Sequence, residues 1–220
     1  TETELLMSIT DKTVFFDVFK EPTADDYIEE ARKAATYIDT RKVQSPNGLI
    51  WSLDDAKTYI SNYYDEICMY AGSAGIAHFY VQLYQATNEE SYLKDAEEAA
   101  RYIIWRWDHK RKLAKCFNKY AFTTGYGGVA VFLDELYSLT KNEEYYRVIG
   151  EIIDSAIRDA IPSDNGEGYY WSTYSGIVGD ASVILLLLEM GKKYNHPEWN
   201  EFAIRAGRFY LNKGRSYSRG

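Results

Sequence analysis

The sequence repeats itself with a period of about fifty residues, which restricts the chain to architectures built from repeated units. A Gly-x-x-Gly motif occurs three times, and its first glycines are 53 and 51 residues apart, at Gly72/Gly75, Gly125/Gly128 and Gly176/Gly179. An asparagine that precedes an aromatic residue by four positions recurs in step, at Asn88, Asn142 and Asn195. Asparagine is a favoured N-cap, so we expect each of these three residues to begin a helix.

Between these landmarks the apolar residues recur with the period of an α-helix. The pattern predicts helical hairpins over about 70–107, 124–160 and 175–212, after a single helix over 24–39. One helix of each hairpin begins at the Gly-x-x-Gly motif and is apolar on nearly all sides, which is typical of a buried helix. The other helix carries Lys, Glu and Arg and is expected to face water. The sequence therefore predicts an all-α fold, an α/α toroid or an open helical solenoid, as one domain over residues 1–220.

The six glycines of the three motifs are expected to be structural. Small residues one turn apart let the start of a buried helix approach the backbone of its neighbour closely. Phosphate binding is the weaker interpretation, because none of the three motifs has a Lys or Arg close by.

Charge and composition restrict the classes of partner and the cellular compartment that we expect for this protein. A net charge of −8 argues against a nucleic-acid partner, which needs a basic surface. Two cysteines, Cys68 and Cys116, are too few for a disulfide framework and fit a reducing compartment. No apolar run is long enough to suggest a transmembrane segment. We therefore expect a cytoplasmic protein.

The repeats also resemble those of a known family. The segment Tyr70-Ala-Gly-Ser-Ala-Gly-Ile-Ala-His-Phe79, with Tyr92-Leu-Lys-Asp-Ala96 after it, is similar to an early repeat of lanthionine synthetase C-like proteins, and the later repeats resemble its successors. The resemblance covers roughly residues 24–212 and implies a toroid of seven helical hairpins. Three hairpins and one further helix are present here, so we expect the N-terminal portion of such a toroid, with a tendency to form homo-oligomers through its open ends.

The resemblance also implies a chemistry. Cyclases of the family hold zinc with a Cys and a later Cys-His pair, and the metal activates a peptide thiol that adds to a dehydrated Ser or Thr. This sequence has no Cys-His dipeptide, so we expect no metal site in this segment, with zinc possible only if further C-terminal repeats supply the ligands. Family cyclases also place a His before one motif glycine, where this chain has Ser175. The resemblance therefore predicts a peptide- or thiol-binding toroid and leaves open whether it is an enzyme.

Two other functions remain open. A glycan-active α/α-toroid enzyme, of the unsaturated uronyl hydrolase or sugar epimerase type, would need paired carboxylates near stacking aromatic residues. The carboxylates near the starts of the buried helices are Asp65, Asp164, Glu167 and Asp180. The second alternative is a non-catalytic scaffold domain of a longer protein.

Each candidate residue also has a structural interpretation. Asp180 falls in the first turn of a helix, where a negative charge offsets the helix dipole. The pattern around His78 favours a hydrogen-bonded core residue. For a peptide, small thiol or sugar in a central cavity, the candidate binding residues are Tyr70, His78, Tyr126, Tyr170, Trp171 and Tyr174.

Overall fold

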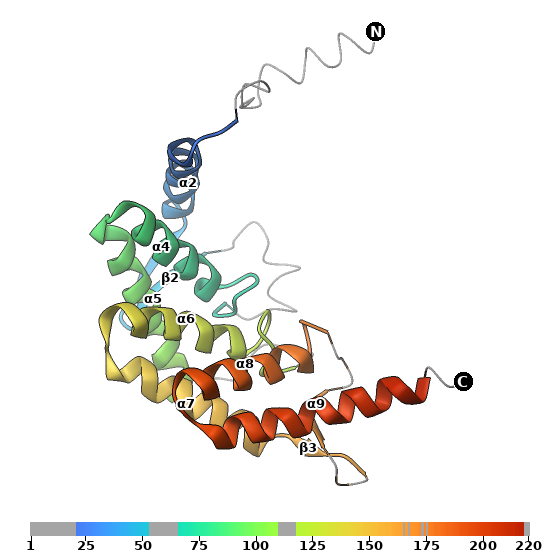
Figure 1. Cartoon of the computed structure of the whole chain (residues 1–220). Helices are drawn as coiled ribbons and strands as arrows, with labels where there is room; N and C mark the ends of the chain where they lie inside the picture. The colour runs from blue at the N-terminus through green and yellow to red at the C-terminus, as the bar shows by residue number, and fades with distance from the viewer. Residues whose placement is uncertain are drawn as a thin grey trace.

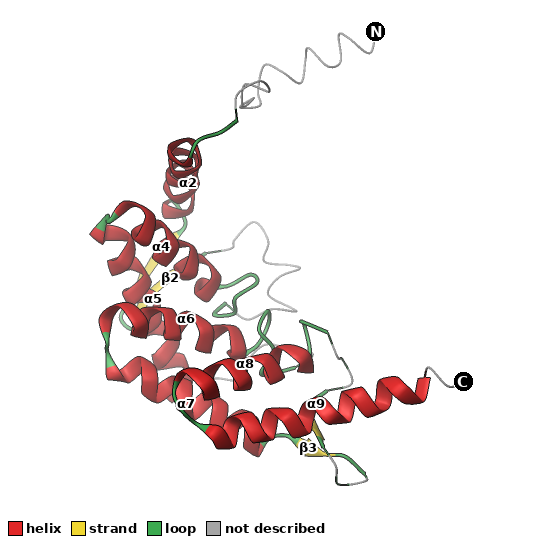
Figure 2. Ribbon diagram, viewed as in Figure 1, coloured by secondary structure: helices red, strands yellow, loops and turns green. Residues whose placement is uncertain are grey.

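The computed structural model describes residues 21–52, 66–109, 118–164, 166, 168–172, 174 and 176–217. Helices account for most of them, with two short pairs of strands (Figure 2). The helices are α2 (Ala24–Asp39), α4 (Ser73–Thr87), α5 (Glu90–Asp108), α6 (Tyr126–Thr140), α7 (Glu143–Arg158), α8 (Asp180–Lys193) and α9 (Pro197–Tyr217). Within these described ranges, no helix combines the length and the apolar character needed to cross a membrane.

The helices form three hairpins, α4–α5, α6–α7 and α8–α9, which follow one another along a curved row (Figure 1). Helix α6 lies between α4 and α8 and contacts both, and α2 packs against α4. The predicted all-α class, with a toroid-like succession of hairpins, is confirmed. We call α4, α6 and α8 the inner helices and α5, α7 and α9 the outer helices.

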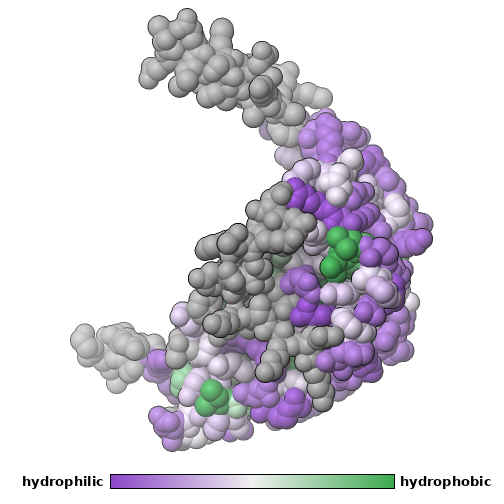
Figure 3. All heavy atoms as spheres, turned by 180° about the vertical axis from the view of Figure 1, so that it is seen from behind, coloured by the Kyte–Doolittle hydropathy of each residue, from purple (hydrophilic) through white to green (hydrophobic). Residues whose placement is uncertain are grey.

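The core is formed within each hairpin and between consecutive hairpins. Phe132, Leu133 and Leu136 of α6 and Ile149 and Ile152 of α7 are fully buried. The outer helices carry apolar residues on one side and charged residues on the other, so their charged side faces water. Figure 3 shows hydrophilic residues over most of the convex side of the molecule.

Helix α8 differs from the expectation that an inner helix is buried on all sides. Leu187 is fully buried, but Leu185 is 57% exposed. Ile177 and Val178, which precede the helix, are exposed as well. These apolar residues therefore face solvent in the described part of the chain.

The structure corrects the alignment of the third repeat by three residues. The residues that cap the inner helices are Gly72, Gly125 and Gly179, so the predicted equivalent Gly176 lies outside the helix. In every copy a residue with positive φ follows the capping glycine by sixteen positions, at the end of the inner helix, and these residues are Asn88, Lys141 and Asn195. The counterpart of Gly75 and Gly128 in the third copy is therefore Ser182.

The capping glycines allow a close approach, but to a different segment from the one expected. The first N–H of the inner helix donates to a carbonyl in the loop before that helix, as in Tyr126 N to Lys119 O at 2.8 Å and Asp180 N to Tyr174 O at 2.8 Å. A Cβ at Gly125 or Gly179 would overlap this loop backbone. Among these glycines, Gly128 is the one whose Cβ would also meet the preceding repeat, at Met69.

The prediction that each recurring asparagine begins a helix is only partly correct. Asn142 caps α7, and its side chain accepts from Glu144 N at 3.1 Å. Asn88 instead ends α4 in the left-handed conformation, and Glu89 is the N-cap of α5. Asn195 has positive φ too. The turn between the helices needs one left-handed residue, and asparagine tolerates that conformation better than most residues.

The segments predicted as loops contain two antiparallel strand pairs. Strands β1 (Lys42–Ser45) and β2 (Gly48–Trp51) form a hairpin against α5, and Gly48, at φ +134°, lies so close to α5 that a Cβ would be 2.7 Å from Tyr102 N. Strands β3 (Ile161–Pro162) and β4 (Tyr169–Tyr170) pair beside α9. Both pairs are too short to give a period-two pattern in the sequence.

Candidate ligand-binding site on the inner helices

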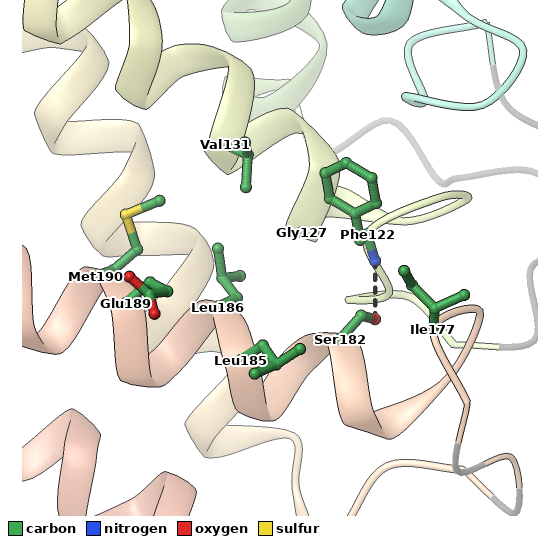
Figure 4. Close-up of a pocket in the computed structure, with 9 residues that line it drawn as sticks. All are labelled: Phe122, Gly127, Val131, Ile177, Ser182, Leu185, Leu186, Glu189 and Met190. Carbon is green, nitrogen blue, oxygen red and sulfur yellow. Dashed lines mark hydrogen bonds between the residues drawn. The ribbon is translucent and has the colours of Figure 1, made fainter.

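A pocket of about 270 Å³ lies between the inner helices α6 and α8 (Figure 4). Val131 of α6 and Leu186 of α8 point toward one another across it. The other apolar lining side chains are Phe122, Ile177, Leu185 and Met190. Glu189 is the one charged residue among the lining residues.

A hydrogen bond fixes the end of the pocket near the start of α8. Phe122 N donates to Ser182 Oγ at 3.0 Å, and the Ser182 hydroxyl donates to Gly179 O at 2.7 Å. Ser182 is buried, so the loop before α6 is held against the first turn of α8. The residue that replaces a motif glycine in the third repeat thus positions one wall of the pocket.

The corrected alignment shows that the pocket-lining positions recur on all three inner helices. Six positions after the capping glycines lie His78, Val131 and Leu185, and ten positions after them lie Gln82, Glu135 and Glu189. The first set contains one histidine and two apolar residues, and the second set is polar throughout. Of these positions, Val131, Leu185 and Glu189 line the pocket, and His78 and Gln82 are the equivalent positions on α4.

His78 and Glu135 join α4 to α6. His78 Nδ1 is 2.6 Å from Glu135 Oε2, and Gln82 Nε2 donates to the other carboxylate oxygen at 3.4 Å. The side chain of His78 is 39% exposed, so it is a half-buried residue of the inner face and not a core residue. The hydrogen bond to Glu135 raises the pKa of His78 above its ordinary value, against an opposing effect of partial burial.

We expect Glu135→Gln to lower the pKa of His78, because the neutral amide no longer stabilises the imidazolium form. The raised pKa also means that the pair stabilises the fold fully below the unfolded-chain value of about 6.5 and loses this effect as the pH rises through the folded value. An NMR titration of the His78 ring protons measures the change. Glu198→Gln, which removes a carboxylate 2.6 Å from His196, is the matched control and should leave the His78 titration unchanged. An unchanged His78 pKa in Glu135→Gln would contradict the assignment.

Asp180, predicted as a candidate acid or base, is completely buried at the start of α8. Its Oδ1 accepts from Asn118 Nδ2 at 2.8 Å and from Ser172 Oγ at 2.6 Å. Its Oδ2 accepts from the backbone N–H groups of Trp171 and Ser172, at 2.7 and 3.1 Å, and from the hydroxyl of Tyr210. These five donors come from three separate segments, so the carboxylate ties two loops and α9 to α8. Burial and the hydrogen bond to Asp180 raise the pKa of Tyr210.

Of the other candidate carboxylates, the structure describes Asp164 alone, and this residue is not among the partners of Asp180. Asp164 is exposed, in the turn between β3 and β4, whereas Asp180 is buried and has donors on both oxygens. Asp65 and Glu167 lie outside the described residues. The described carboxylates therefore lend no support to a paired acid and base for glycan cleavage, and the catalytic role of Asp180 stays a prediction.

Most of the candidate aromatic residues have packing partners. Tyr170 stacks on Phe209 of α9 with ring centroids 5.1 Å apart, and Trp171 Nε1 donates to Ala156 O at 2.7 Å. Tyr126 is buried against Trp107. Tyr70 and Tyr174 are exposed and do not line the pocket.

Sequence reasoning missed the residues that line the pocket, apart from their general apolar pattern. Val131, Leu185 and Glu189 carry no motif of their own. The repeat could have singled them out, but the alignment on Gly176 placed the third repeat out of step by three residues. That shift hid the equivalence of Leu185 and Glu189 to His78 and Gln82.

The described residues contain no group of three or more His, Cys, Asp or Glu side chains placed to hold a metal ion. Cys68 is buried. Cys116 lies outside the described ranges. The described side chains thus do not fit a zinc site.

A comparison with known protein families gives a match over the second and third hairpins. Residues 116–210 match the model of a family described as lanthionine synthetase C-like protein. The match spans α6, α7, α8 and most of α9, and with them the pocket and Asp180. The resemblance noted in the sequence is confirmed over these residues. No curated protein matches the chain.

Proposed function

We propose that this chain is a lanthionine synthetase C-like protein, a single α/α-toroid domain, whose inner helices bind a peptide segment or a small thiol. The pocket between α6 and α8 is the binding site in this proposal. It lies inside the region that matches the family model, on the inner helices, where a toroid encloses its central cavity. The relationship to zinc-dependent thioether cyclases is part of the proposal and is not needed for binding.

The pocket itself is the observation that carries this proposal. Six apolar side chains line it, and one of them, Leu185, is exposed to an extent that is unusual for a leucine of an inner helix. Its volume of about 270 Å³ is below the roughly 300–1,000 Å³ of pockets that enclose drug-sized molecules. A site of this size suits one or two side chains of a larger ligand, with the rest of the ligand lying along the inner helices.

Selection from a phage library of random peptides, followed by calorimetry, tests the proposal, with glutathione as the small-thiol probe. We expect Leu185→Gln to weaken the binding of a selected ligand about tenfold or more, because burying a leucine side chain contributes roughly 1.5–3 kcal/mol. Backbone NMR shifts of Val131, Leu185 and Met190 should change on binding.

Leu211→Gln is the matched control, because Leu211 is a similarly exposed leucine, at 64%, on the outer helix α9. This variant should bind as the unmodified chain does. If the library yields no binder and glutathione gives no heat, or if both leucine variants lose binding equally, the proposal is wrong.

A further inference from the structure

Three of the four carboxylates on α6 and α8 have partners. Asp134 Oδ2 accepts from Lys193 Nζ at 2.7 Å, and its Oδ1 accepts from the Tyr194 hydroxyl at 2.5 Å. Glu135 is paired with His78 and Gln82, and Asp180 has five donors. Each of these three carboxylates therefore has a cationic or hydrogen-bonding partner among the described residues.

Glu189 is the exception. It is exposed, it lines the apolar pocket, and it makes no hydrogen bond or ion pair with any residue that the structure describes. Lys193, one turn further along α8, is already held by Asp134 and by Ser138 Oγ at 2.8 Å. The pocket thus combines an apolar interior with one carboxylate that lacks a counterion among the described residues.

We propose that the pocket selects peptides in which an apolar residue lies two positions from a lysine or arginine, with the apolar side chain in the pocket and the cation on Glu189. This inference rests on the proposed function and specifies its ligand. Charge complementarity supports it, because a ligand cation supplies the partner that Glu189 lacks. A neutral apolar ligand would leave this carboxylate without one.

The spacing follows from the geometry of α8. Glu189 lies four residues beyond Leu185 on α8, a rise of about 6 Å along the helix axis. In an extended peptide, residues two positions apart lie on the same side and are roughly 6.6 Å apart. An extended peptide that runs along α8 beside the pocket therefore places an apolar side chain next to Leu185 and a basic side chain next to Glu189.

A charge-reversal selection tests this specificity. The probe is a phage library of random peptides of about twelve residues, selected in parallel on the unmodified chain, on Glu189→Lys and on Glu201→Lys. We expect the unmodified chain to enrich the apolar-x-basic pattern and Glu189→Lys to enrich an apolar-x-acidic pattern. Glu201 is an exposed residue of the outer helix α9, and its reversal changes the net charge by the same amount. The Glu201→Lys selection should resemble that of the unmodified chain.

Calorimetry with one enriched peptide measures how much Glu189 contributes to the affinity. Because an exposed ion pair contributes roughly 0.2–1 kcal/mol, Glu189→Gln should weaken binding by about 1.5- to fivefold, and the difference should shrink at high salt. If Glu189→Lys and Glu201→Lys shift the enriched peptides alike, the preference comes from net charge and the inference is overturned. In that case Leu185→Gln still reports on the proposed function, because it removes an apolar contact and no charge.

Two further outcomes are decisive. Peptide binding that needs Leu185 but is insensitive to Glu189 overturns the specificity and leaves the proposed function standing. If sedimentation shows that the chain self-associates and that Leu185→Gln abolishes the association, a second copy occupies the pocket, and both the specificity and the peptide site are wrong.

Discussion

Asp180→Asn is expected to lower the free energy of unfolding by about 3 kcal/mol or more, measured by urea denaturation. The carboxylate accepts from five donors while it is completely buried. An asparagine amide offers one oxygen in place of two and puts N–H groups against donors that need an acceptor. The loss of hydrogen bonds to a charged group and the unsatisfied buried donors both oppose folding.

Asp164→Asn is the matched control. Asp164 is exposed in the turn between β3 and β4, so the same chemical change should alter the stability by no more than about 0.5 kcal/mol. If Asp180→Asn were as stable as the control, the carboxylate would not anchor α8. A role as a glycan acid or base would then regain support, since that role predicts lost turnover on an intact fold.

Gly179→Ala is expected to destabilise the chain by about 2 kcal/mol or more. A Cβ at this position would overlap the Tyr174 carbonyl oxygen and would lie 2.8 Å from Tyr174 Cβ. The same carbonyl accepts the hydrogen bond from Asp180 N at 2.8 Å, so the loop cannot move away without breaking it. Thermal or urea unfolding measures the effect.

Gly176→Ala provides the comparison, because it makes the same substitution three residues earlier. A Cβ there would meet no atom of the described residues within 4 Å, so we expect a change of no more than about 0.5 kcal/mol. The opposite ranking, with Gly176 sensitive and Gly179 tolerant, would restore the alignment predicted from the sequence and would contradict the one in the structure.

The periodicity in the sequence was enough to predict the helical fold. The heptad-like spacing of apolar residues after Gly72 and Gly125 matches α4 and α6, which begin directly after these glycines. Local rules suffice here, because helix formation and burial depend on neighbours three or four positions away. The same rules failed at Asn88, where two local roles of asparagine compete: the N-cap of one helix and the left-handed end of another.

What the sequence determined by itself is the approximate period, the helical class and which helix of each hairpin is the more apolar one, since all three follow from local patterns. Only the tertiary structure decided which glycine caps α8, because Gly176 and Gly179 both satisfy the motif and only Gly179 packs against the Tyr174 backbone. The pocket also depends on the tertiary structure, because the packing of α6 on α8 brings Val131 and Leu185 together. The tertiary structure also decided the surroundings of Asp180. Its donors Asn118, Trp171, Ser172 and Tyr210 meet through contacts that no local pattern encodes.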